Sequence, residues 1–181
     1  MKRASAVLMM IFASAFAVSG CGYTTKTSLP DHIRSVHVPR IENKIDISAE
    51  ISEKKPFQVY RPGLEVELRN ALIDRLVFDG HLRVATDAVS DATLIAELTG
   101  FDREPLRYNA NDTIQEFRIR VTASARLVDK QSGQVIWSAK DVSGDSEYFL
   151  SGVNAGSEDQ SVQDALTDLV RHIVENILEV W

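Results

Sequence analysis

The sequence contains a single cysteine in 181 residues, so it offers no pair for an intramolecular disulfide. The histidines show no zinc-binding helix spacing, and the chain has no GxSxG, P-loop or GxGxxG motif. A glycosidase-like pair of carboxylates would not be visible in one sequence, but nothing in the pattern favours one. We therefore expect a protein that is not an enzyme and that holds no metal and no cofactor. Structural or surface roles are expected for the histidines, which are His32, His37, His81 and His172.

No apolar run is long enough to cross a bilayer comfortably. The run at 4–18 follows two basic residues and ends in small ones, which is the order of a secretory signal peptide. Cys21 follows the cleavage position, with the aliphatic Val18 three residues before it and small residues between. This pattern resembles the bacterial lipobox, in which the thiol is diacylated, the chain is cut before the cysteine and the new amine is acylated. We predict that residues 1–20 are removed and that Cys21 is lipidated; the alternative is an ordinary signal peptide with a chance cysteine nearby.

Lipidation at Cys21 would hold the protein at a membrane without making it cross the bilayer. Several acyl chains on one residue far exceed the marginal anchoring of a single chain. Gly22 stands where an aspartate would favour retention in the inner membrane of enteric-type bacteria, so the outer membrane is favoured. The small, polar stretch that follows is typical of a tether. We predict a lipidated tether at 21–30 and a single α+β domain at 31–181.

Basic residues are in the minority. Without the two basic residues of the signal peptide, 18 Lys and Arg (20 minus 2) stand against 26 Asp and Glu, a net charge near −8. Nucleic-acid binding requires clustered positive charge, so an acidic domain argues against it. The same balance argues against broad electrostatic adhesion to an anionic membrane surface. Any contact with an anionic ligand must therefore come from a local basic cluster.

Two segments have the spacing of amphipathic helices. Leucines recur at helical spacing in 62–79, where Pro62 suits the first helical position and Gly80 suits the stop. The second helix begins with a capping box at 157–160 and runs to the C-terminus. The predicted strands are 33–41, 81–85, 91–101, 116–128 and 134–142. Apolar and polar residues alternate most cleanly in the fourth strand, which makes the strongest hairpin signal with the fifth.

The remaining segments predict connections. Residues 103–113 and 143–156 are polar or rich in Gly and Ser and are expected to be loops, and 42–61 is long enough to be a candidate binding loop. The order of strand, helix, a run of strands and a second helix predicts an α+β fold. Two helices should then pack on one face of a mostly antiparallel sheet. The side chains expected in the core are Leu68, Leu72, Phe117, Ile119, Val121, Trp137, Leu166, Leu169 and Ile173.

Basic side chains fall on the polar face of the predicted hairpin. They are Arg118, Arg120, Arg126 and Lys140. Arginine can hold a phosphate or a carboxylate through two parallel hydrogen bonds, so these residues are the candidate contacts for an anionic ligand. The other interpretation is a solvated strand face, on which the arginines pair with Glu97 and Glu116 across the sheet.

Short motifs along the chain occur in the order that is found in a known family. They are Cys21-Gly22-Tyr23, Leu29-Pro30, Val38-Pro39, Asn43, Gly63-Leu64-Glu65, Asp79-Gly80, Asp91-Ala92, Leu98-Thr99-Gly100, Glu116-Phe117-Arg118-Ile119 and Gly133-Gln134-Val135-Ile136-Trp137. In this order they resemble the lipopolysaccharide-assembly lipoprotein family, LptE. The similarity extends over nearly the whole chain after the signal peptide.

The resemblance implies a fold, a location and a partner. The expected fold has two helices packed on a four-stranded, mixed sheet, and the expected location is the outer membrane, with the domain lipid-anchored and facing the periplasm. Members of the family plug the LptD β-barrel translocon, help to assemble it, and so support insertion of lipopolysaccharide into the outer leaflet. They carry no catalytic residues. Lipopolysaccharide binding is attributed to basic residues in some members, and no such motif matches here residue by residue.

A second class of function stays open, that of a lipoprotein activator or accessory subunit of a periplasmic cell-wall synthase or lipid transporter. Such proteins are also small α+β domains on a lipid tether. An activator that reaches through the peptidoglycan would have a long linker, whereas the tether predicted here is short. The short tether favours the barrel plug.

Overall fold

The computed structural model describes residues 29–45 and 61–178. The signal peptide at 1–20, the lipidation site expected at Cys21 and most of the candidate binding loop at 42–61 lie outside these residues. Within them, neither helix has the length and apolar composition that crossing a bilayer would require.

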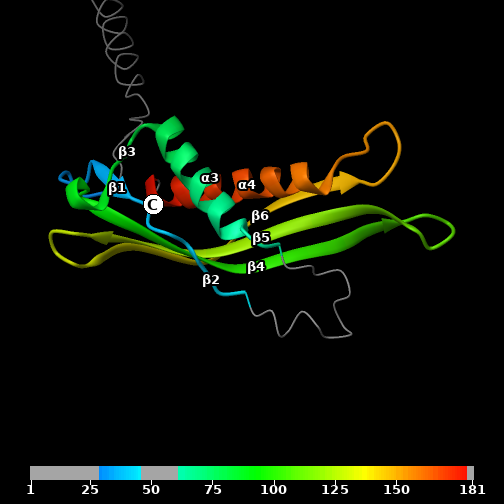
Figure 1. Ribbon diagram of the computed structural model, residues 1–181, viewed down its shortest axis with the longest axis horizontal. Helices are drawn as coiled ribbons and strands as arrows, with labels where there is room; N and C mark the ends of the chain where they lie inside the picture. The colour runs from blue at the N-terminus through cyan, green and yellow to red at the C-terminus, as the bar shows by residue number, and fades with distance from the viewer. Residues whose placement is uncertain (1–28, 46–60, 179–181) are drawn as a thin grey trace, which may run out of the picture.

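One mixed sheet forms the base of the domain (Figure 1). Its strands are β1 (Ser35–His37), β2 (Glu42–Asn43), β3 (Arg83–Val84), β4 (Ala92–Tyr108), β5 (Ile114–Asp129) and β6 (Val135–Phe149). The order is β3-β1-β4-β5-β6, and β2 also pairs with β4. The long strands β4, β5 and β6 are antiparallel, whereas the short strands β1, β2 and β3 pair in parallel. The α+β prediction is confirmed, with six strands in the described sheet where the family resemblance implied four.

The three antiparallel strands are longer than the alternation of apolar residues indicates. β4 continues to Tyr108 and β6 to Phe149, so the first half of each of the loops expected at 103–113 and 143–156 is strand. A strand of 17 residues is about 55 Å long. The alternation of apolar residues does not continue into these ends of the strands, because charged residues on neighbouring strands lie opposite one another there. Examples are Arg107 opposite Glu116 and Arg118 opposite Glu147.

The first helix, α3 (Leu64–Asp79), buries one row of leucines at four-residue spacing. It begins after Gly63, which has a φ of 88°, so Pro62 precedes the helix and is not its first residue as predicted. Gly80 ends the helix as predicted: it adopts a φ of 78° and its N–H donates to the carbonyl of Leu76 at 3.1 Å. The buried residues are Leu64, Leu68, Leu72 and Leu76.

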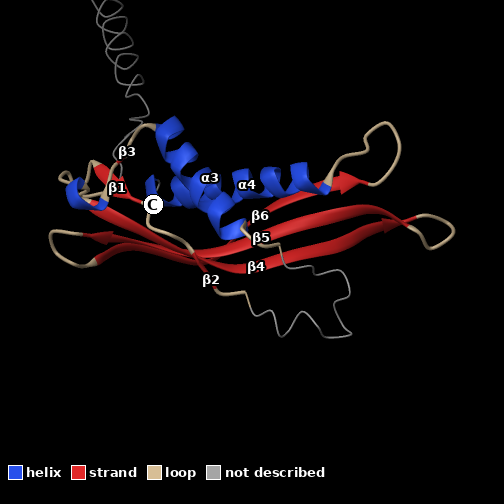
Figure 2. Ribbon diagram, in the orientation of Figure 1, coloured by secondary structure: helices blue, strands red, loops and turns tan. Residues whose placement is uncertain are grey.

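The second helix, α4 (Glu158–Leu178), lies with α3 on the same side of the sheet, as Figure 2 shows. The Ser157 hydroxyl accepts the Gln160 N–H at 3.1 Å, which is half of the predicted capping box. α4 packs on β5 and β6, and α3 packs against α4. All the predicted core residues belong to one buried cluster except Trp137, which is half-buried and packs against the rim of that cluster.

Candidate functional site

The face of the sheet opposite the helices carries the candidate basic residues, and we call it the open face. Arg118 and Arg120 alternate on β5 with side chains that are buried under the helices. In the register of the three long strands, each arginine lies between two acidic residues. The two cross-strand rows are Glu104–Arg118–Glu147 and Asp102–Arg120–Asp145.

The two arginines are bound to carboxylates on β6. The Arg118 guanidinium donates to one oxygen of Glu147 from Nη2 at 2.7 Å and from Nε at 3.2 Å. This hydrogen bond raises the pKa of Arg118 above its ordinary value. Arg120 Nε donates to Asp145 Oδ1 at 2.7 Å. An anionic ligand would have to compete with these carboxylates, so the geometry favours a ladder of internal ion pairs.

The other two basic residues lie apart from this pair. Arg126 is six residues from Arg120 on β5, about 20 Å along the strand. Its Nη1 lies 3.8 Å from Glu97, the pairing expected for a solvated strand face. Lys140 is exposed and has no ion pair within the described part of the chain. The sheet therefore brings Arg118 and Arg120 together and leaves Arg126 and Lys140 separate.

Glu116, the second acidic partner expected for the arginines, has a different role. It is buried, at 6% exposure, and its carboxylate lies 3.3 Å from Arg107 Nε on the neighbouring strand. The Arg107 guanidinium also lies 5.5 Å from the ring of Phe149. A buried carboxylate requires a partner of this kind. The pair therefore stabilises β4 and β5 close to the turn that joins them.

A second polar cluster joins the sheet to the start of α4. Arg103 Nη1 donates to Glu158 at 2.6 Å, and the Tyr148 hydroxyl donates to the same carboxylate oxygen at 3.1 Å. Burial raises the pKa of Tyr148 to about 12, with the negative charge of Glu158 as a second cause. Arg103 also stacks over the ring of Phe117 at 4.8 Å. The sequence pattern does not reveal this cluster, because Arg103 lies in a segment predicted to be a loop.

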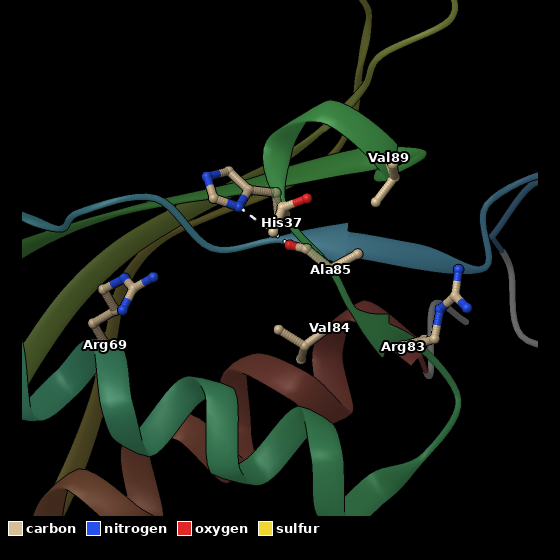
Figure 3. Close-up of a pocket in the computed structure, with 7 residues that line it drawn as sticks. His37, Arg69, Arg83, Val84, Ala85 and Val89 are labelled. Atoms are coloured by element: carbon tan, nitrogen blue, oxygen red, sulfur yellow. Dashed lines mark hydrogen bonds between the residues drawn. The ribbon is translucent and has the colours of Figure 1, made fainter.

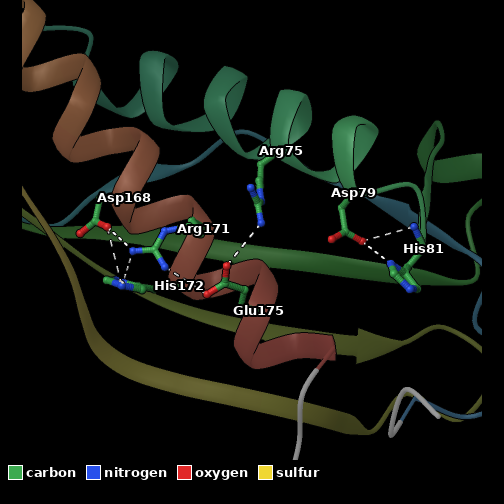
Figure 4. Close-up of polar contacts among 7 residues, drawn as sticks. All are labelled: Arg75, Asp79, His81, Asp168, Arg171, His172 and Glu175. Carbon is green, nitrogen blue, oxygen red and sulfur yellow. Dashed lines mark hydrogen bonds and ion pairs between the residues drawn. The ribbon is translucent and has the colours of Figure 1, made fainter. Parts of the chain in front are cut away.

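Side chains of α4 cover part of the free edge of β6. Asp168 accepts the Asp145 N–H at 3.2 Å, and His172 Nδ1 donates to the Ser143 carbonyl at 2.9 Å. Burial tends to raise the pKa of Asp168, but hydrogen bonds from Arg171 and from the Asp145 N–H lower it overall. Figure 4 shows these residues on α4. Such contacts occupy backbone groups that would otherwise be open to another strand.

The same helix is joined to α3 by an ion pair. Arg75 Nη2 lies 3.4 Å from Glu175, which also accepts from Arg171 at 3.3 Å (Figure 4). At the end of α3, Asp79 lies 2.5 Å from His81 Nδ1. Within 29–45 and 61–178 no group of three or more His, Cys, Asp or Glu side chains has an arrangement that could hold a metal ion. These contacts join elements together, and none forms a nucleophile–base pair of the kind used in catalysis.

Comparison with known proteins gives a family and a fold. The model of the lipopolysaccharide-assembly family LptE matches residues 33–179. Protein XCC0632 from Xanthomonas campestris is 13% identical, with 82% of this chain and 88% of that chain covered at a TM-score of 0.53. An uncharacterized lipoprotein B from Nitrosomonas europaea is 15% identical, with 88% and 89% covered at a TM-score of 0.51. At these identities the two structures show a shared fold alone, and no curated protein sequence matches the chain.

Proposed function

Because this chain belongs to the lipopolysaccharide-assembly family LptE, we propose that it is an outer-membrane lipoprotein that plugs and helps to assemble an LptD-type β-barrel. In this role it supports insertion of lipopolysaccharide into the outer leaflet. The observation that carries the proposal is the family match over 33–179, which covers both helices and the whole sheet up to the last residues of the chain. The family is one of non-enzymatic lipopolysaccharide-assembly lipoproteins.

The charge pattern on the open face of the sheet favours a partner with a polar interior. The interior of an outer-membrane barrel is polar, whereas its outer surface is apolar. On the open face, arginines and carboxylates already pair with one another, as in Arg118–Glu147 and Arg120–Asp145. A face whose charges are paired can enter a polar lumen without leaving an isolated charge desolvated.

The predicted anchor supports a position close to the membrane. Eight peptide steps separate Cys21 from Leu29, the first described residue, and eight extended residues reach at most about 28 Å. A lipid on Cys21 would therefore hold the start of the domain within this distance of the bilayer surface. A subunit of a barrel has to stay this close, whereas an activator that reaches through the cell wall would require a longer connection.

Co-purification tests the proposal directly. The full-length protein, tagged at its C-terminus, is isolated from detergent-solubilised outer membranes, and the extract of an untagged strain is the control. We expect one large partner whose electrophoretic mobility changes on heating, as a folded β-barrel does. Depletion of the protein should also lower the amount of that folded barrel. Recovery of a cell-wall synthase or an inner-membrane transporter, with no barrel, would contradict the proposal.

A further inference from the structure

Two large apolar side chains in the last turn of α3 lie mostly in solvent, and we call them the α3-end patch. Val77 is 65% exposed and Phe78 is 82% exposed. The leucines of α3 occupy its buried face, so neither residue belongs to the row that packs on the core. The Arg75 guanidinium lies 5.7 Å from the centre of the Phe78 ring. Exposed apolar side chains that adjoin one another are more informative than scattered ones, because a second surface can bury them together.

The α3-end patch lies at the end of the domain where the described chain begins. β1 and β3 are parallel, and in their register Ser35 lies opposite Arg83. Phe78 is five residues before Arg83, and Leu29 is six residues before Ser35. Even if they were fully extended, these segments would reach only about 18 and 22 Å from the strand pair. Figure 1 shows the first described residues (blue), β3 and the end of α3 (green) together at this end.

The predicted anchor brings a bilayer to the same end of the domain. The eight peptide steps from Cys21 to Leu29 reach at most about 28 Å. A short connection of this kind gives a local concentration of about millimolar, so a contact that would be too weak between separate partners becomes populated. Two apolar side chains can then suffice, whereas a stable interface between two proteins requires about 800 Å² from each. These observations favour the bilayer over a second copy of the chain.

Charge at this end does not oppose contact with lipid headgroups. In the part of the chain that the structure describes, eight arginines lie within ion-pair distance of an Asp or Glu. The remaining arginines in that part are Arg34, Arg40, Arg69 and Arg83. Arg34 and Arg83 are exposed and adjacent, since the Arg83 N–H donates to the Arg34 carbonyl at 3.0 Å. Asp31 and Asp74 are exposed carboxylates at the same end, so the apolar pair has to supply the main attraction.

Arg69, on the same helix, is turned toward the domain and away from such a contact. Its Nε donates to the carbonyls of Val38 and Pro39 at 3.1 and 3.2 Å. Arg69 and Arg83 line one groove beside β3, and Figure 3 shows them near opposite ends of the view. A bilayer at the end of the domain would therefore meet Arg83 and would not meet Arg69.

We propose that the α3-end patch contacts the bilayer in which Cys21 is anchored, with Val77 and Phe78 at the boundary between headgroups and acyl chains. The inference rests on the predicted lipidation of Cys21, which is part of the proposed function, and does not require the barrel. The contact is apolar and local, so it does not require the broad positive surface that the acidic composition excludes. It orients the domain, with the end that carries the tether at the membrane and the β4–β5 turn at the other end of the sheet (Figure 1).

Fluorescence quenching in the full-length, lipidated protein tests this inference. The protein is reconstituted without a barrel into vesicles of phosphatidylethanolamine and phosphatidylglycerol, with and without a nitroxide on the acyl chains. Asp74→Cys, one turn before Phe78, carries a thiol-reactive fluorophore, and lipidation of Cys21 leaves this new cysteine as the sole free thiol. We expect the nitroxide to quench the label at 74. The same label on Val153→Cys, fully exposed in the loop between β6 and α4, should not be quenched.

A pair of exposed aromatic residues provides the matched variants. Phe78→Ser should lower the ratio of docked to free orientations about tenfold or more, the effect of withdrawing one aromatic side chain from an apolar phase, and the quenching at 74 should be lost with it. Tyr108→Ser removes a half-exposed ring near the β4–β5 turn and should leave the quenching unchanged.

The outcomes separate failure of the patch from failure of the anchor. Equal quenching at 74 and 153 would overturn the inference, and so would quenching at 74 that persists in Phe78→Ser or that Tyr108→Ser reduces equally. Incorporation of the fluorophore into the parent protein would show that Cys21 is free, and would overturn the inference together with the predicted anchor. None of these results depends on the barrel, which co-purification tests separately.

Discussion

Gly144 should be indispensable for the packing of α4 on the sheet. It lies in β6 opposite Val121, on the side of the strand that faces the helix. A Cβ added at this position would lie 2.2 Å from both the Ala165 carbonyl oxygen and the Leu169 nitrogen. These are backbone atoms of α4, which cannot turn away as a side chain does. Gly144→Ala would therefore force β6 and α4 apart.

The size of the effect follows from these distances. Restoring ordinary contact near 3.4 Å from 2.2 Å requires a displacement of roughly 1 Å, and a gap of that size removes a quarter to a half of the dispersion energy of the atoms that line it. Overpacking in a core costs about 1–3 kcal/mol and more where nothing can relax. We expect Gly144→Ala to lower the free energy of unfolding by about 3 kcal/mol or more, a large part of the total stability of a domain.

Gly100→Ala is the matched control, because it makes the same substitution in β4. The added Cβ would lie 3.2 Å from the Cβ of Thr122, a side chain that can shift by a few tenths of an ångström. The free energy of unfolding should change by less than about 1 kcal/mol. Urea unfolding followed by circular dichroism measures both variants, and 3 kcal/mol corresponds to a midpoint about 1.5 M lower at a typical slope. Equal midpoints for the two variants would show that α4 does not approach β6 as closely as described.

Three further predictions concern the anchor, the β5–β6 turn and the open face. Cys21→Ser should abolish labelling with palmitate, and a labelled variant would exclude lipidation at this residue. Hydrogen bonds, first from the Ser132 hydroxyl and then from the Gln131 N–H and His32, lower the pKa of Asp129 from 3.8 to about 2. The stability that the ionised carboxylate confers is complete above the unfolded value and is lost as the pH falls through that value toward 2. Ser132→Ala should raise this pKa, measured by NMR titration, and an unchanged value would refute the stated cause. If Arg118 and Arg120 contact an anionic ligand, replacing both with Ala should weaken lipopolysaccharide binding, and the loss should be largest at low salt. An unchanged affinity would show that the two arginines form internal ion pairs and do not contact the ligand.

The sequence predicted those parts of the fold in which the apolar pattern itself determines structure. Alternation in 116–128 placed Phe117, Ile119 and Val121 on the buried face of β5, and all three are buried. The leucine spacing of 62–79 predicted the helix and the residues that it buries. In both segments the periodicity reflects contact with the core, so it can be read from one chain.

The ends of the long strands could not be predicted in the same way. Gly144 lies in a stretch rich in Gly and Ser, a composition typical of a loop, yet this glycine is in a strand where a helix backbone approaches closely. Arg103 and Arg107 have the appearance of surface loop residues, yet they pair with Glu158 and Glu116. In each case the determining contact comes from a residue that is distant in the sequence, and single-sequence patterns do not report such contacts.

The candidate sites could not be fully predicted either, because the ion pairs of an arginine also depend on residues that are distant in the sequence. The sequence placed Arg118 and Arg120 on the polar face of a strand, which is where they lie, and drew attention to them because they are clustered. In the structure these clustered arginines have carboxylate partners, whereas Arg69 and Arg83, which are isolated in the sequence, have none among the described residues and line one groove. A binding site for an anionic group requires positive charge without an internal partner. Clustering of arginines along the chain is therefore a poor guide to such a site in an acidic domain. Whether an arginine can bind an anionic ligand or is used in an internal ion pair is decided by its partners in the folded protein.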